Sequence, residues 1–103
     1  MKIEYNKLVR DKIPEIIKAT GKSCKIRILK QNEYTEMLKK KLEEECNEYL
    51  ESGETEEIAD ILEVLRALAV NSKATWDEIE VMRQEKVEKR GDFTSRVLLK
   101  WVD

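Results

Sequence analysis

The sequence predicts a mainly all-α protein, built on an antiparallel helical hairpin that is followed by a third helix. Apolar residues recur at helical spacing over residues 32–52 and again over 55–72, with a break at Gly53 between the two stretches. Thr75 and Glu78 have the spacing of a capping box, which is typical of a helix start. Three helices joined by short connections are therefore expected.

Shorter elements are expected at the two ends of the chain. A short helix should begin near Pro14, because proline is tolerated in a first helical turn, and should end at Gly21. Residues 24–29 alternate apolar and basic side chains as a strand does, and residues 95–102 can supply a second strand. We expect these two segments to pair as a small terminal two-stranded β element.

The three longer helices have recognisable ends. Gly53 ends the first, and Thr55 is the expected N-cap of the second. The third should stop at Gly91, after Lys89 and Arg90 have placed positive charge in its last turn. Because three short helices enclose little core, their apolar faces are expected to pack against another copy. This predicts a homodimer or homotetramer with a four-helix-bundle-type core.

Composition excludes several classes of protein. The 103 residues predict one domain over residues 1–103, and charged and apolar residues at 41% each fit neither a disordered chain nor a membrane protein. The start has no apolar signal segment, and Cys24 and Cys46 are isolated, which indicates reduced thiols in the cytoplasm. The absence of histidine excludes histidine-based triads and metal sites. The net charge of -2 argues against binding to a nucleic acid polymer.

Acidic residues are concentrated in the two helices of the hairpin. Residues 43–65 hold ten carboxylates and no lysine or arginine. At about 100° per residue, Glu45 falls inside the apolar stripe of the first helix and Glu48 lies at its edge. In the next helix Glu57 lies at the margin of a face formed by apolar residues, and Asp60 follows one turn on. That apolar face comprises Ile58, Ile61, Leu65 and Leu68.

Other acids on the same two helices project away from the apolar faces and are expected to be solvated surface. They are Glu43, Glu51, Glu54, Glu56 and Glu63. An isolated Glu-Glu-x-x-Glu pattern is also ordinary helix surface in a chain of this charge. What indicates a site is the presence of two clusters in successive antiparallel helices, each at an apolar margin and with no compensating base nearby.

Carboxylates that face a core without a partner are unfavourable unless a cation compensates them. Oxygen ligands without histidine or paired cysteine favour Mg²⁺, with Mn²⁺ as a possible substitute, over zinc or copper. Such cations imply phosphate chemistry. On the third helix, Lys86 and Arg90 lie one turn apart and can offer a point charge and a planar fork to phosphate oxygens. Structural salt bridges to the acidic helices are the alternative role.

Four segments of the chain resemble a known superfamily. They read YNKLVRDKIPEII at residues 5–17, KLEEECNE at 41–48, EEIADILEV at 56–64 and KVEKRGDF at 86–93. Together they are similar to the MazG-like, all-α nucleoside triphosphate pyrophosphohydrolases, a superfamily that includes phosphoribosyl-ATP pyrophosphohydrolases and dimeric dUTPases. One departure is Asp92, where related sequences often have a second glycine.

The resemblance implies a magnesium site and a set of roles. The pattern E-E-x-x-E followed by E-x-x-D corresponds to Glu44, Glu45 and Glu48, then to Glu57 and Asp60. Glu45, Glu48, Glu57 and Asp60 would then be the metal ligands. Glu44 and Glu45 would be the catalytic pair, with Glu44 orienting the attacking water.

The same resemblance implies the reaction. Water would attack the α-phosphorus of a canonical or damaged nucleoside triphosphate, releasing the monophosphate and pyrophosphate. The phosphate tail would be held by Lys86 and Arg90, with Lys12 and Arg10 as further candidates. Two alternatives remain open: hydrolysis of phosphoribosyl-ATP in histidine biosynthesis, and a non-catalytic module that senses nucleotide or binds a protein through its helices.

Overall fold

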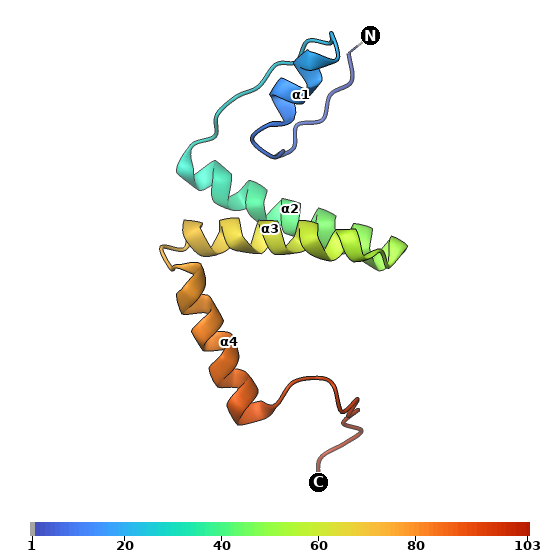
Figure 1. Ribbon diagram of the computed structural model, residues 1–103, viewed down its shortest axis with the longest axis vertical. Coiled ribbons are helices and arrows are strands. Elements are labelled where there is room, and N and C mark those ends of the chain that lie inside the picture. Colours follow the sequence, from blue (N-terminus) through green and yellow to red (C-terminus); the bar gives the residue numbers. More distant parts are fainter. Residues whose placement is uncertain (1) are drawn as a thin grey trace.

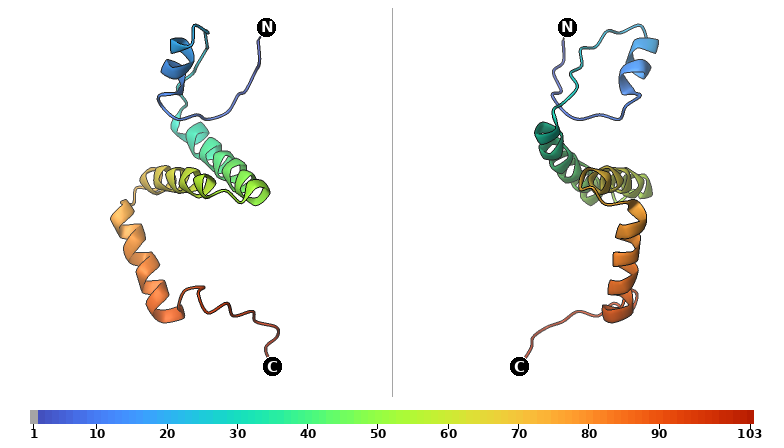
Figure 2. Two further views of the ribbon diagram at one scale, coloured as in Figure 1. Left: turned by 45° about the vertical axis from the view of Figure 1, so that its right-hand side comes forward. Right: turned by 90° about the vertical axis from the view of Figure 1, so that its left-hand side faces the viewer.

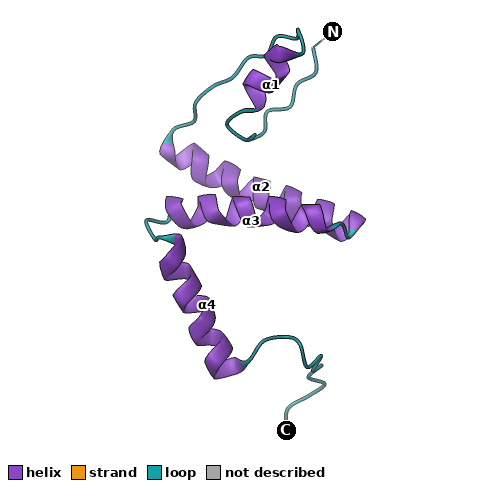
Figure 3. Ribbon diagram, viewed as in Figure 1, coloured by secondary structure: helices purple, strands orange, loops and turns teal. Residues whose placement is uncertain are grey.

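Four helices make up the regular structure of the residues that the structure describes (Figure 1). The computed structural model describes residues 2–103. The helices are α1 (Ile13–Ala19), α2 (Gln31–Ser52), α3 (Thr55–Asn71) and α4 (Trp76–Arg90). Between residues 2 and 103 every regular element is a helix (Figure 3). The expectation of an all-α fold is confirmed, and the three longer helices end within one residue of their expected bounds.

The α2–α3 hairpin is the centre of the fold, and it is tied at both ends. Gly53 closes it with a φ of 67°, and its N–H donates to the Tyr49 carbonyl at 2.7 Å. Glycine suits this turn because a Cβ at positive φ crowds the backbone. At the opposite end, the Asn71 side chain donates to Thr35 Oγ1 at 2.9 Å and accepts from Gln31. These contacts set how far along α2 each residue of α3 lies.

The buried core of the chain is small and lies between α2 and α3. Its apolar members are Leu38, Val64 and Ala69. The remaining buried residue is the charged Glu45, which is 7% exposed. On α3, Ile58 and Leu65 of the expected apolar face are 50% and 39% exposed. Within one chain this face is therefore only partly covered.

Helix α4 leaves the hairpin and does not pack along it (Figure 2). Thr75 caps its start by accepting from the Glu78 N–H at 3.1 Å, and Gly91 follows its last residue, both as expected. Near the start of the helix, the Arg66 guanidinium lies 4.8 Å from the centre of the Trp76 ring. Because α4 points away from the hairpin, the molecule is elongated, with extents of 60 × 32 × 25 Å.

The expected two-stranded β element is wrong for the part of the chain that the structure describes. Residues 24–29 belong to the connection between α1 and α2, whereas residues 95–102 follow α4 at the far end of the molecule (Figure 1). A strand needs a partner for its backbone groups, and these segments are too far apart to pair. Ile28 and Val97 illustrate the result, since each is 85% exposed.

The short helix α1 agrees with its expected position, with Pro14 in the first turn and Gly21 just beyond the end at a φ of 86°.

Within residues 2–103, none of the helices has the length and apolar character required to cross a bilayer.

Candidate metal centre

Five carboxylates meet where α2 and α3 lie side by side. One carboxylate oxygen from each of Glu44, Glu45 and Glu48 lies within 4.8 Å of the others, and the same holds for Glu45, Glu57 and Asp60. Glu45 belongs to both groups and joins them. We refer to these five residues as the acidic centre. Helical spacing singles out four of them, Glu45, Glu48, Glu57 and Asp60, and the family pattern adds Glu44.

The local structure explains why these acids gather. On α2, Glu48 lies four residues after Glu44 and three after Glu45, so it neighbours both on the helix surface. On α3, Glu57 and Asp60 are neighbours for the same reason, because they are three residues apart. The Gly53 turn reverses the chain, so the start of α3 lies against the end of α2. The acids expected on the surface are all exposed: Glu43, Glu51, Glu54, Glu56 and Glu63.

Glu45 is the most constrained member of the acidic centre. Its side chain is 9% exposed, and its Oε1 lies 3.2 Å from the Lys41 Nζ. Its Oε2 is buried and has no hydrogen-bond partner. A buried carboxylate oxygen that lacks a partner loses its hydration without replacement, which is unfavourable. The acidic centre is therefore short of positive charge or of a donor at this atom.

The titration of Glu48 reflects the same shortage of positive charge. The pKa of Glu48 is raised above its usual value, and the neighbouring Glu45 carboxylate is the main cause, through a shared proton and through its negative charge. Desolvation and the charges of Glu57 and Glu44 add to the effect.

Two cations from the start of the chain reach the acidic centre. The Arg10 Nη2 lies 2.8 Å from the Asp60 Oδ1, and the Lys7 Nζ lies 3.2 Å from the Glu44 Oε1. With Lys41, three bases contact the acids. The expectation that no base lies nearby is therefore wrong. Lys41 lies one helical turn before Glu45, whereas Lys7 and Arg10 are 37 and 50 positions from their partners in the sequence.

These bases change the titration of Glu44. Partial burial acts to raise the pKa of Glu44, but the hydrogen bond from Lys7 and the positive charges of Lys41 and Lys7 outweigh it. The pKa of Glu44 is lowered as a result, in contrast to that of Glu48. The acidic centre thus has one side that faces cations and one side that lacks them.

The residues of the acidic centre fit a hard divalent cation. All of their donor atoms are carboxylate oxygens, which Mg²⁺ and Mn²⁺ prefer, and they come from the two helices of one hairpin. The unpartnered Glu45 Oε2 is the specific observation in favour, because a cation there would satisfy an atom that no protein group satisfies. Glu45 would be the shared ligand, with Glu48, Glu57 and Asp60 around it.

The other expected phosphate ligands are not at the acidic centre within one chain. Lys12, Lys86 and Arg90 are exposed, and α4, which holds the last two, extends away from the hairpin (Figure 1). Of the four expected phosphate ligands, the structure brings only Arg10 to the acids. Lys7 was missed by the sequence reasoning, although its place three residues before Arg10 in an unstructured, basic segment is a signal that could have found it.

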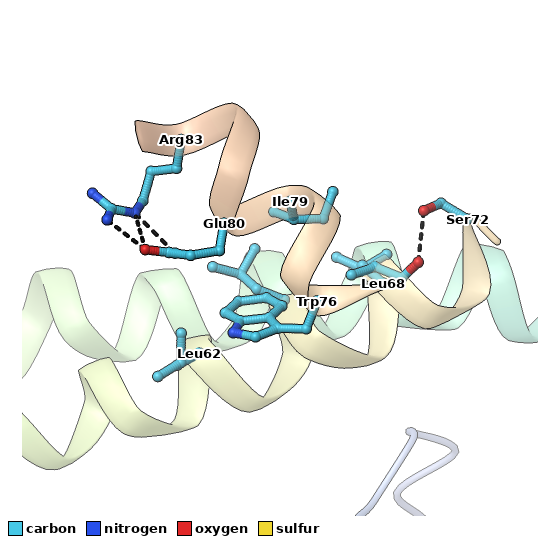
Figure 4. A pocket seen from close by; sticks show the side chains of 9 residues that line it. Leu62, Leu68, Ser72, Trp76, Ile79, Glu80 and Arg83 are labelled. Atoms are coloured by element: carbon cyan, nitrogen blue, oxygen red, sulfur yellow. Dashed lines mark hydrogen bonds and ion pairs between the residues drawn. The ribbon is translucent and has the colours of Figure 1, made fainter. Parts of the chain in front are cut away.

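An open apolar hollow of about 600 Å³ lies between α3 and the start of α4 (Figure 4). Leu62 and Leu68 of α3 face Trp76 and Ile79 of α4 across it, and the Glu80–Arg83 ion pair borders it. Trp76 itself is half-buried beside this uncovered apolar surface.

Comparisons with known proteins add little about activity. No family model matches the chain. A stretch of 52 residues is 46% identical to an uncharacterized protein of Mycolicibacterium smegmatis (strain ATCC 700084 / mc(2)155), covering 50% of this chain and 52% of that protein. The chain thus spans about half the length of the curated relative that it matches. No solved structure matches.

Proposed function

We propose that this chain is a Mg²⁺-dependent nucleoside triphosphate pyrophosphohydrolase of the MazG-like superfamily, acting in the cytoplasm. In the reaction, the oxygen of a water molecule bonds to the α-phosphorus, and the bond from that phosphorus to the bridging oxygen of the β-phosphate breaks. Pyrophosphate leaves with the electron pair, and the nucleoside monophosphate remains. The protons of the water pass to carboxylates and solvent.

The observation that carries this proposal is the convergence of five carboxylates from two antiparallel helices around Glu45, whose Oε2 has no partner. Surface acids are common, but a buried carboxylate that belongs to two acidic groups is not explained by solubility. The sequence resemblance supplies the reaction class, and the acidic centre supplies ligands suited to the metal that this class needs.

Each residue of the acidic centre has a role in the proposal. Glu45, Glu48, Glu57 and Asp60 hold Mg²⁺, which, when bound, polarises phosphate oxygens and offsets the charge of the leaving pyrophosphate. Glu44 lies at the edge of the centre and orients the attacking water. Its ion pair with Lys41, on the same helix, holds its carboxylate in position.

We also propose that two or four copies of the chain assemble into a four-helix-bundle-type core. The radius of gyration is 18.2 Å, whereas a compact domain of this length has a value of about 13 Å. Leu62 and Leu65 are 47% and 39% exposed on the hollow beside Trp76. A second copy of the hairpin would cover this apolar surface. Lys86 and Arg90 of α4 would then be able to reach the acidic centre of a second copy.

Sedimentation equilibrium tests the assembly. We expect a mass at least twice that of one chain, and we expect Leu62→Arg to shift it toward the monomer, because a charge in the hollow opposes burial. Ile16→Arg is the matched control, since Ile16 is 57% exposed on α1 and lies outside the hollow. A mass of one chain at every concentration contradicts the assembly.

A substrate panel tests the reaction. Canonical and oxidised nucleoside triphosphates and phosphoribosyl-ATP are incubated with and without Mg²⁺, and pyrophosphate is measured. Turnover of simple nucleoside triphosphates that needs no phosphoribosyl adduct supports the proposal, and turnover of phosphoribosyl-ATP alone assigns the chain to histidine biosynthesis. Nucleotide binding without pyrophosphate release would mean that the chain is a sensing module.

A further inference from the structure

The segment before α1 crosses the acidic centre. We define residues 5–10 as the amino-terminal strap. Within it Asn6 has a φ of 45°, a left-handed conformation that asparagine tolerates better than most residues. Beyond this turn the Lys7 and Arg10 side chains extend to Glu44 and Asp60, on α2 and α3. The strap thus carries two cations to both helices of the centre.

The strap contacts are exposed and can exchange partners. The Lys7 and Arg10 side chains are 42% and 57% exposed, and their carboxylate partners Glu44 and Asp60 are 31% and 40% exposed. Solvent-exposed ion pairs of this kind add little stability. The strap has no helix or strand of its own. Lys7 and Arg10 can therefore leave their carboxylates when a better partner for either side arrives.

The net charge of the acidic centre indicates which new partners Lys7 and Arg10 would take. The five carboxylates of the acidic centre meet three bases, Lys41, Lys7 and Arg10, so negative charge remains in excess. The buried Glu45 Oε2 is the atom at which this excess is uncompensated. A divalent cation there satisfies the acids. A triphosphate brought to that cation then presents new negative oxygens beside the two strap cations.

We propose that Lys7 and Arg10 are the phosphate-binding residues of this site, exchanging Glu44 and Asp60 for the β- and γ-phosphate oxygens of the substrate when the metal binds. The inference rests on the proposed function and deepens it by naming the cations that recognise the polyphosphate. The Arg10 guanidinium provides a planar fork that matches phosphate geometry, and Lys7 provides a point charge. In the absence of substrate the same side chains keep the carboxylates paired.

Calorimetry on the full-length chain separates metal binding from phosphate binding. Mg²⁺ alone and inorganic tripolyphosphate with Mg²⁺ are titrated into the wild type, Lys7→Met and Arg10→Gln. Because hydrogen bonds between charged groups are worth enough for about a tenfold change in affinity, we expect each substitution to weaken tripolyphosphate binding at least about tenfold. Mg²⁺ affinity should be unchanged or higher, because the strap no longer competes for the carboxylates.

Two further variants complete the test. Lys18→Met removes an exposed positive charge from α1, away from the acidic centre, and should bind tripolyphosphate as the wild type does. Arg10→Lys should recover part of the lost affinity, since it keeps the charge but not the fork. The midpoint of thermal unfolding should be the same for all variants, because the strap ion pairs are exposed.

Four outcomes overturn the inference. In Lys7→Met and Arg10→Gln, the first is an unchanged affinity for tripolyphosphate, and the second is a higher affinity, which would mean that the strap hinders binding. The third is a loss of both Mg²⁺ affinity and thermal stability in these two variants. The fourth is that the wild type does not bind tripolyphosphate. The proposed function fails on a different result, namely no pyrophosphate release from any nucleotide with Mg²⁺. A wild type that turns over nucleotide but shows any of the four outcomes refutes the role of the strap alone.

Discussion

Replacing Glu45 by glutamine is expected to abolish Mg²⁺ binding and to lower pyrophosphate release by more than about 100-fold. The change keeps the size of the side chain but removes the charge that both acidic groups share. Substitutions of residues that only support a metal ligand already reduce affinity or activity about 10- to 100-fold, so loss of the shared ligand should exceed that range. Without Mg²⁺ the variant should be at least as stable as the wild type, because a buried and incompletely paired charge has been removed.

The matched controls for Glu45→Gln are Glu43→Gln on α2 and Glu63→Gln on α3. Both residues are exposed acids on the same two helices and lie outside the acidic centre. Each control removes one negative charge, so any general effect of net charge on Mg²⁺ appears in all three variants. Calorimetry and pyrophosphate release should leave both controls near wild type. Equal losses in all three variants would refute the selection of these acids by helical phase.

Removing Mg²⁺ is expected to have the second large effect. A chelator should stop turnover and also lower the midpoint of thermal unfolding, because an ion that binds only the folded chain stabilises it. At 100 times its dissociation constant Mg²⁺ contributes about 2.7 kcal/mol, which for a chain of this length is a shift of more than about 10 °C. Differential scanning calorimetry with Mg²⁺ and with chelator measures the shift, and Glu45→Gln should show none. If the unfolding midpoint of the wild type is the same with Mg²⁺ and with chelator, the proposed metal site is wrong.

The stabilisation by Mg²⁺ should depend on pH. The pKa of Glu48 is raised in the folded chain. The stability that this group contributes is therefore complete below the pKa of an unfolded glutamate and is lost as the pH rises through the raised value. A bound cation takes the place of the proton, so the shift in unfolding midpoint caused by Mg²⁺ should be larger at pH 7 than at pH 4.

Local patterns in the sequence were sufficient to predict most of the helices. The stop at Gly53, the cap at Thr75 and the end at Gly91 are each set by residues within one turn, and all three agree with the structure. The acidic centre could be predicted for a related reason. The side of a helix on which a residue lies follows from its spacing along the helix, which is a local property. Because only two residues join α2 and α3, α3 has to lie antiparallel beside α2.

Features that depend on distant residues could not be predicted in the same way. The alternation in residues 24–29 and 95–102 describes a strand only if a partner is within reach, and the direction of α4 keeps the two segments apart. Lys7 and Arg10 reach Glu44 and Asp60 across 37 and 50 positions, and no local pattern records such contacts.

The apolar face of α3 shows a different limit. Its helical phase identifies Leu65 as apolar surface to be covered, but phase does not say which chain covers it. Within one chain the side chain stays 39% exposed. In the proposed assembly, a second copy of the chain covers Leu65.

The most direct test of the central claim is the fate of ¹⁸O from labelled water during hydrolysis of a nucleoside triphosphate with Mg²⁺. Mass spectrometry of both products shows which phosphorus the water attacked. We expect nucleoside monophosphate and pyrophosphate, with the label on the monophosphate and none on the pyrophosphate at early times. Label in the pyrophosphate, release of a nucleoside diphosphate, or no hydrolysis of any triphosphate in the panel would contradict it.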